Sequence, residues 1–203
     1  STHVQSYGWQ ADKFNGMTSG TTGLGKRLEA IKIKVSGAYD LGVTYQTHVQ
    51  TFGWGDWVAD GDLSGTTGQS KRLEAIRIKL TGNDADKFDV YYRVHAQTFG
   101  WLGWAKNGET AGTSGFAKRL EAIQIYVVPK GMTPSTGTSA VSYVQYGRSA
   151  SKSDQPGLIN YATHVQTYGN QLCVSDGSFS GTYGEAKRLE AIRSQVNNEA
   201  LGV

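Results

Sequence analysis

The chain has 203 residues, which is enough to bury a core within one domain, and 38% of them are hydrophobic. No apolar run approaches the roughly 18 residues of a transmembrane helix, and the single cysteine, Cys173, excludes an internal disulfide without fixing the compartment. The net charge is only +3 and the Lys-Arg pairs stand beside glutamates, so the composition disfavours nucleic acid as a partner.

One block of 29 residues occurs four times without an internal gap. Thirteen positions are identical in all four copies, and a regular period of this size is typical of a repeat architecture. The first copy lacks the tyrosine-bearing segment that precedes the second, so we interpret the chain as a mature product or a piece of a longer polypeptide. The copies begin at His3, His48, His95 and His164, which are 45, 47 and 69 residues apart. In second-copy numbers the identical positions are His48, Gln50, Gly53, Gly61, Gly65, Thr66, Gly68 and Lys71 to Ile76.

Each block predicts short β-strands. Residues 43–52 and 90–99 are rich in β-branched and aromatic residues with an alternating pattern. Asp60-Gly61 supplies the positive φ values of a two-residue hairpin turn, and "GTTG" at 65–68 marks a second bend before a strand at 71–80. We therefore expect an all-β fold with about four short strands in each repeat. The same turn is expected at Asn15-Gly16, Asn107-Gly108 and Asp176-Gly177.

An insertion separates the fourth copy from the third. Residues 128–139 are rich in Pro, Gly, Ser and Thr, as in a linker, and residues 140–147 predict an additional strand. We divide the single repeat domain 1–203 into repeat 1 (1–36), repeat 2 (37–82), repeat 3 (83–129), the insertion (130–160) and repeat 4 (161–203).

The invariant segment "KRLEAI" carries a glutamate inside an apolar strand. A partly buried carboxylate is tolerated only with partners, and Arg72 is one partner of Glu74. His48 is a second partner if the preceding strand pairs alongside. Alternation places Arg72, Glu74, Ile76, Ile78 and Leu80 on one face, with the last three in the core, and Leu73, Ala75, Arg77 and Lys79 on the other face.

We expect these polar groups to form a structural network that fixes the strand register in each repeat. They could instead contact a ligand at a repeat boundary. A catalytic His–Glu pair is disfavoured because no Ser or Cys nucleophile recurs beside it, so we expect no enzymatic activity, no metal and no cofactor in this chain. An attached catalytic domain could lie outside it. The network residues are His48, Arg72 and Glu74 in the second copy and His95, Arg119 and Glu121 in the third.

The five tryptophans all follow the strand that contains the block's histidine, and they precede the Asn/Asp-Gly turn. They do not recur fully, because the fourth copy has Asn170 and Cys173 at their positions. A core tryptophan would recur with the core, so we expect some to be exposed, where an indole can stack on a sugar ring beside polar side chains. The alternative is that they cap the ends of the repeat cores. The predicted ligand-binding residues are Trp9, Trp54, Trp57, Trp101, Trp104, Gln50, Gln97, Asp60 and Asn107.

The stretch "YQTHVQTFGWGDWVADGDLSGTTGQSKRLEAIRIKL" resembles the ChW repeat, the module named clostridial hydrophobic with conserved tryptophan. The resemblance rests on Tyr-x-x-His-Val-Gln, Gly-Trp, Gly-Thr-x-Gly and Arg-Leu-Glu-Ala. It covers all four blocks, and the fourth departs from it at Gly169-Asn170. It implies a secreted or cell-surface protein of a Gram-positive bacterium, in a family whose repeats are appended to wall hydrolases, glycosidases and adhesins.

Two functions of different classes remain after this reading. The first is a lectin-like module for targeting or adhesion that binds bacterial cell-wall or host glycans at repeated weak sites, which act together through avidity. The second is a non-catalytic protein–protein interaction module, in which the tryptophans anchor a surface protein.

The sequence leaves the closure of four repeats open. Units of four short strands suit a β-prism or a β-trefoil, both of which use three units. Either the first and last blocks are partial and complete one another, or the fourth packs outside a three-repeat core, or four units form a ring. Exchange of strands between chains would also allow a swapped dimer, so the oligomeric state is not fixed.

Overall fold

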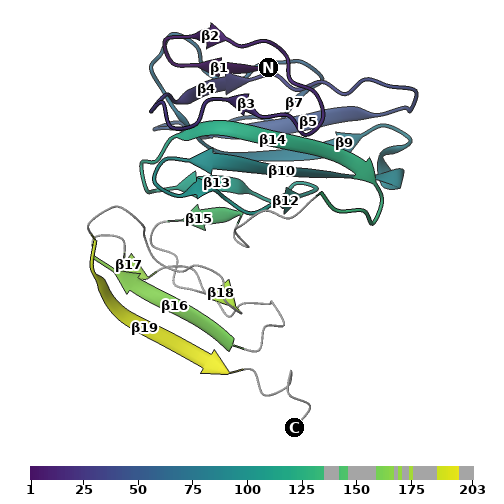
Figure 1. Cartoon of the computed structure of the whole chain (residues 1–203). Coiled ribbons are helices and arrows are strands. Elements are labelled where there is room, and N and C mark those ends of the chain that lie inside the picture. Colours follow the sequence, from purple (N-terminus) through teal and green to yellow (C-terminus); the bar gives the residue numbers. More distant parts are fainter. Residues whose placement is uncertain (135–141, 146–158, 167–168, 171–173, 176–186, 197–203) are drawn as a thin grey trace.

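The structure is a computed structural model that describes residues 1–134, 142–145, 159–166, 169–170, 174–175 and 187–196. In these residues the regular structure consists of strands, apart from one turn of 3-10 helix, η1, at Ala85–Lys87 (Figure 1). The predicted all-β class is confirmed. No helix in the described part of the chain is long and apolar enough to cross a membrane.

Repeats 2 and 3 share one pattern of five strands, in which two long strands pair over their full length. The short strands after each tryptophan-bearing turn fold back on the first long strand in two pieces, which is why five strands form where four were predicted. Repeat 2 contains β5 (Gly42–Val49), β6 (Gly53–Trp54), β7 (Val58–Ala59), β8 (Ser64–Gly65) and β9 (Leu73–Thr81). Repeat 3 contains β10 (Phe88–Ala96), β11 (Gly100–Trp101), β12 (Ala105–Lys106), β13 (Ala111–Ser114) and β14 (Leu120–Pro129). Repeat 1 contains β1 (Thr2–Val4), β2 (Gly8–Trp9), β3 (Ser19–Gly20) and β4 (Leu28–Ile31).

The first three repeats complete one another's sheets. Strand β8 of repeat 2 pairs with β4 of repeat 1, β13 of repeat 3 pairs with β9 of repeat 2, and β3 of repeat 1 pairs with β14 of repeat 3. The exchange returns to its starting point after three repeats, and the buried apolar side chains of all three form a single core. These pairings support a closed three-repeat body, and its description as a β-prism or a β-trefoil stays a prediction.

An invariant glycine makes each exchange possible. Gly65 has φ +109, and a Cβ on it would lie 2.5 Å from the carbonyl oxygen of Glu29 and 2.8 Å from Cα of Ala30. The next residue, Thr66, donates its N–H to the same Glu29 carbonyl at 2.9 Å. Gly20 approaches Ala122, and Gly112 approaches Ala75, in the same way. The glycine of "GTTG" and the alanine of "KRLEAI" are therefore the two sides of one contact.

The glutamate of "KRLEAI" is the extra residue of a β-bulge. His48 lies opposite Ala75 and Val49 lies opposite Leu73, so Glu74 has no residue opposite it on β5. The bulge interrupts the alternation, and both Leu73 and Ala75 are buried. The prediction that Leu73 lies on the face away from Ile76 and Ile78 was wrong, because it assumed an unbroken two-residue period, and Leu73 belongs to the same core cluster as those two residues. The same register shift occurs in the other three repeats, at residues 3–4, 95–96 and 164–165.

The strands of repeat 4 form a separate sheet (Figure 1). The additional strand predicted within residues 140–147 is confirmed as β15 (Tyr143–Gln145), which pairs in parallel with β13. The predicted turn at Asp176-Gly177 lies outside the described residues. The strands of repeat 4 are β16 (Ile159–Val165), β17 (Gly169–Asn170), β18 (Val174–Ser175) and β19 (Leu189–Val196).

We predict that Gly65→Ala destabilises the protein far more than Gly68→Ala. Both glycines have positive φ, so both substitutions carry the strain of a left-handed alanine, about 1–2 kcal/mol. Only at Gly65 does the new methyl group meet the backbone of another repeat, which adds about 1–3 kcal/mol of overpacking. Urea unfolding of the two variants measures the difference. Equal losses would show that the close approach of the repeats does not control stability.

Candidate functional site

A buried carboxylate lies at the centre of each of the first three repeats. In repeat 2, one oxygen of Glu74 accepts hydrogen bonds from Arg72, at 2.8 and 3.0 Å, and the other lies 3.2 Å from Nδ1 of His48. In repeat 3, Glu121 lies 3.0 Å from His95 and 2.8 Å from Arg119. The structure thus brings together the residues predicted to form a polar network. The bulge is the reason, because it turns the glutamate toward the histidine of the neighbouring strand.

The electrostatics of this cluster hold the glutamate in its charged form. Burial by itself raises the pKa of Glu74, but the hydrogen bonds and positive charge supplied by His48 and Arg72 outweigh burial, so the pKa lies below its ordinary value. A carboxylate held in this way has both oxygens occupied by protein groups. The arrangement suits a structural anchor better than a general base.

Each histidine also supports a tryptophan. The ring of Trp54 meets His48 edge-on, with centroids 5.5 Å apart, and the guanidinium of Arg77 lies over the indole at 4.2 Å. Trp9 has the same edge-on contact with its histidine at 5.4 Å, and the ammonium of Lys32 lies over its ring at 5.1 Å. Carboxylate, imidazole, indole and cation therefore contact one another in sequence in each of the first three repeats.

Repeat 3 keeps the cation but takes it from the opposite strand. The position of Arg77 is occupied by Gln124, and the position of its strand partner Gln46 is occupied by Arg93. Arg93 lies 5.0 Å from the ring centre of Trp101 and 4.7 Å from that of Trp104. Burial lowers the pKa of Arg93. The arginine and glutamine have exchanged strands, and a guanidinium still lies over the indole.

The tryptophan side chains differ in the fraction of their surface that is exposed to solvent. Trp9 and Trp57 are each 40% exposed, whereas the other three are half-buried. Lys79 lies over the ring of Trp57 at 4.8 Å. Trp104 instead meets Tyr126 edge-on, at 5.5 Å between centroids. The sequence did not single out these cations, although Arg77 and Lys79 stand two residues apart on the face that carries the indoles.

The other predicted ligand-binding residues are largely engaged with the backbone. Asp60 has φ +23, and its carboxylate accepts the N–H of Val43 at 2.9 Å. Asn107 has φ +45 and accepts the N–H of Val90 at 2.9 Å. These contacts hold the predicted two-residue turns against the starts of β5 and β10. Gln50 and Gln97 follow the same strands, their side chains are half-buried, and their backbone N–H groups donate to the carbonyls of Arg72 and Arg119.

Asp89, which the sequence analysis did not select, is the most strongly held acid among the described residues. Its carboxylate is fully buried and accepts hydrogen bonds from Asn107 at 2.8 Å and from the N–H of Gly131 at 3.0 Å, with the ammonium groups of Lys106 and Lys130 at 3.1 and 3.3 Å. Burial alone raises the pKa of Asp89, but these donors hold it well below its ordinary range. Asp89 thereby ties the start of the insertion to β10.

An apolar hollow of about 730 Å³ is lined by residues of repeat 1 and of strands β10 and β14. In repeat 2 the leading part of β5 carries Tyr45, a buried residue whose hydroxyl donates to the carbonyl of Asp62 and accepts the N–H of Ile33. Ile33, which Tyr45 contacts in this way, lines the hollow. The walls include Ile33, Val35, Val90 and Ile125.

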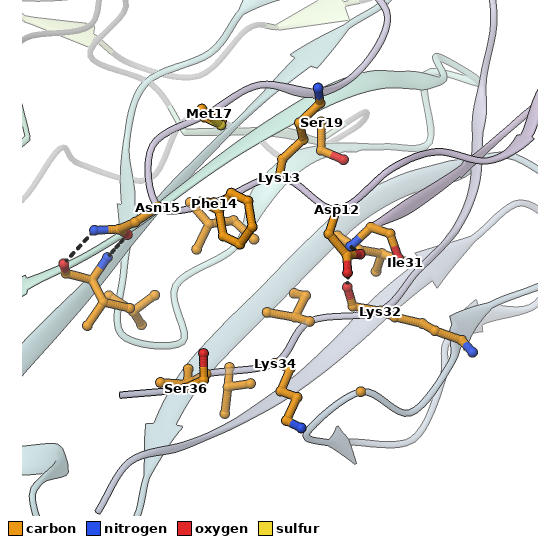
Figure 2. Close-up of a pocket in the computed structure, with 18 of the residues that line it drawn as sticks. Asp12, Lys13, Phe14, Asn15, Met17, Ser19, Ile31, Lys32, Lys34 and Ser36 are labelled. Atoms are coloured by element: carbon orange, nitrogen blue, oxygen red, sulfur yellow. Dashed lines mark hydrogen bonds and ion pairs between the residues drawn. The ribbon is translucent and has the colours of Figure 1, made fainter. Parts of the chain in front are cut away.

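Polar and exposed apolar groups surround this hollow. Figure 2 shows Phe14 and Met17 along one side and Lys32, Lys34 and Ser36 along the other. Asn15 closes one end, because its side chain pairs with both the N–H and the carbonyl of residue 127 on β14, at 2.7 and 3.1 Å. Asn15 does not adopt the positive φ of Asp60 and Asn107, so only Gly16 of that predicted turn does.

Within the ranges that the structure describes, no group of three or more His, Cys, Asp or Glu side chains could hold a metal ion. The sites that are present are stacks of aromatic and cationic side chains on an internally repeated β-body. Such features define a tandem-repeat β-module in which the aromatic–cation contact recurs from repeat to repeat.

Comparison with known families identifies the repeat. The family model for Clostridial hydrophobic W (ChW) matches residues 3–37, 48–82, 95–129 and 164–198. The chain therefore belongs to the ChW family, with four copies of its repeat. No curated protein and no solved structure matches the chain.

We predict that the Glu74 cluster makes stability fall at acid pH. Because the pKa of Glu74 is lower in the folded state, its contribution is complete above the ordinary value of 4.5 and is lost as the pH falls through the folded value. Glu74→Gln should lower the free energy of unfolding at pH 7 by about 1–3 kcal/mol, and the gap to the unaltered protein should narrow at pH 3. Urea unfolding at both pH values is the measurement. Asp56→Asn, at an exposed carboxylate, is the control, and a gap that is the same at pH 3 and pH 7 would contradict the assignment.

Proposed function

We propose that the chain is a non-catalytic, extracellular binding module that attaches to carbohydrate, on a bacterial cell wall or a host surface, through its tryptophan-bearing turns. The observation that carries the proposal is the pair of exposed indoles, Trp9 and Trp57, each with a lysine ammonium over its ring. Membership of the ChW family and the repetition of the turns are consistent with a surface module that binds through several weak contacts.

The exposed indoles suit a sugar ligand for a physical reason. An indole at the surface offers a flat apolar face to the C–H groups of a sugar ring, while nearby polar groups bind hydroxyls. Lys32 and Lys79 occupy space over one face of each ring, so a ligand is left the remaining face and the edge. A positive charge beside each site favours a saccharide that carries carboxylate or phosphate groups.

The absence of catalytic function is part of the proposal. The His–Glu pairs are consumed by the structural stack, since each glutamate oxygen has its own partner in the protein. The histidine of each pair contacts the indole edge-on and holds it in place for binding.

A second candidate function is a protein–protein interaction module of a secreted or surface protein. The apolar hollow favours it, because an extended segment of a partner would find Ile31, Ile33 and Val35 along one wall. In that case the indoles would serve as interface anchors. A pull-down that captures a protein, combined with a glycan array without hits, would favour this second function.

We predict that Trp9→Ala combined with Trp57→Ala weakens glycan binding at least tenfold, which corresponds to about 1.4 kcal/mol. Binding is measured on an array of neutral and acidic wall fragments, with tryptophan fluorescence recorded for every hit. Phe14→Ala is the matched control, because Phe14 is an exposed aromatic residue that lines the hollow, which neither Trp9 nor Trp57 lines.

A companion variant tests the charge preference. Lys32→Gln combined with Lys79→Gln should reduce binding of acidic fragments more than binding of neutral ones. Unchanged binding in the double tryptophan variant would exclude the indoles as the sugar platform.

A further inference from the structure

The residue that follows "KRLEAI" is held by a neighbouring repeat at two boundaries of the three-repeat body. At the boundary between repeats 2 and 3, Nε of Arg77 donates to the hydroxyl of Thr110 at 2.9 Å. At the boundary between repeats 3 and 1, the side-chain amide of Gln124 donates to the hydroxyl of Thr18 at 2.9 Å. A threonine on the far side of the boundary therefore fixes each of these two polar side chains in place.

The boundary between repeats 1 and 2 cannot form this bond. Lys32 follows "KRLEAI" in repeat 1, and strand β8 of repeat 2 pairs beside it through Ile31 and Ser64. The place of the two threonines is taken by Leu63, whose side chain has no hydrogen-bonding group. The ammonium of Lys32 lies over the ring of Trp9, at 5.1 Å, without a hydroxyl from repeat 2 to anchor it.

A second position, two residues further along the chain, shows the same contrast. In repeat 2 this position is Lys79, whose ammonium lies 4.8 Å from the ring centre of Trp57. Its stem also packs against repeat 3, since a Cβ on Gly108 would lie 2.5 Å from Cε of Lys79. In repeat 3 the position is Tyr126, which contacts the equivalent tryptophan and glycine. Both side chains are thus enclosed between an indole and the next repeat.

In repeat 1 the second position is Lys34, and both sides of the enclosure are altered. Asp12 replaces the tryptophan, and nothing lies within 4 Å of a Cβ built on Gly61, the equivalent glycine. The carboxylate of Asp12 lies 3.6 Å from the amine of Ser1, with which it forms an ion pair. Lys34 therefore has open space where Lys79 is packed.

Lys32 and Lys34 present two ammonium groups on one side of an extended segment. Both side chains are exposed, whereas Ile33 and Val35 are half-buried, so the two lysines point the same way, about 7 Å apart along the backbone. Figure 2 shows both along one side of the hollow. In the part of the chain that the structure describes, neither ammonium forms an ion pair with a carboxylate. An anion placed between them is attracted by both charges.

We propose that the boundary between repeats 1 and 2 binds the acidic groups of an anionic saccharide, with Lys32 and Lys34 on the acidic group and Trp9 against the adjoining sugar ring. This inference rests on the proposed carbohydrate binding and assigns the preference for acidic ligands to one boundary of the three. At the other two boundaries the corresponding side chains are held by protein groups, so they contribute less to the binding of an acid.

Titration calorimetry of the full chain with inorganic tripolyphosphate tests the site without a sugar. Lys32→Gln combined with Lys34→Gln should weaken binding by about tenfold or more, because both charges that face the anion are removed. The matched control is Lys26→Gln combined with Lys71→Gln, which removes the same charge from two lysines that lie over Tyr7 and Phe52. The control should weaken binding by less than about twofold, since charges beyond a Debye length are screened. Equal melting temperatures show that both variants are folded.

The outcomes separate this inference from the function on which it rests. No tripolyphosphate binding by the unaltered protein, or equal weakening in the two double variants, would overturn the inference. Array hits whose binding is the same with and without Lys32 and Lys34 would support the carbohydrate function and overturn the inference as well. Tripolyphosphate binding that depends on Lys32 and Lys34, together with an array without hits, would support the anion site and reject a saccharide as the molecule that carries the acid.

Discussion

The close approach of a glycine in one repeat to an alanine in another is the constraint on which the rest of this protein depends. A side chain at Gly65 would collide with the backbone of repeat 1 at Glu29 and Ala30. The two backbones come near enough for the threonine N–H to reach the glutamate carbonyl. Because each repeat gives this segment away and receives another, no repeat of the first three completes its own sheet, and the three share one core.

A second layer of organisation is built on that contact. The glutamate beside the alanine bulges out of the strand pairing, and its carboxylate reaches the histidine of the adjacent strand. The histidine supports the indole, and a cation lies over the indole. The exchange of Arg77 and Gln46 for Gln124 and Arg93 is informative, because the two strands changed residue types together and the cation remained. A cationic side chain over the indole is therefore a shared feature of the first three repeats, whichever strand supplies it.

Much of this could be predicted from the sequence, and the failures have physical causes. The all-β class and the extra strand near residue 143 follow from local composition and turn chemistry. The residues of the carboxylate cluster follow from the need of a half-buried charge for partners. The burial of Leu73 could not be predicted from a two-residue period, because the bulge adds a residue that the period does not contain. The exchange between repeats was also hidden, since a repeat length defines the unit and leaves open which unit each strand joins.

The cyclic exchange also bears on how such chains can change in length. When every unit lends a strand to the unit before it and the first lends to the last, a set is complete only at a fixed number of members. Loss or duplication of a single repeat would change which repeats exchange strands with one another, for every repeat after it. Genes that encode chains of this kind should therefore tolerate gains and losses of repeats in threes more readily than singly. The number of repeats in a chain is then limited by a contact that only a glycine can make.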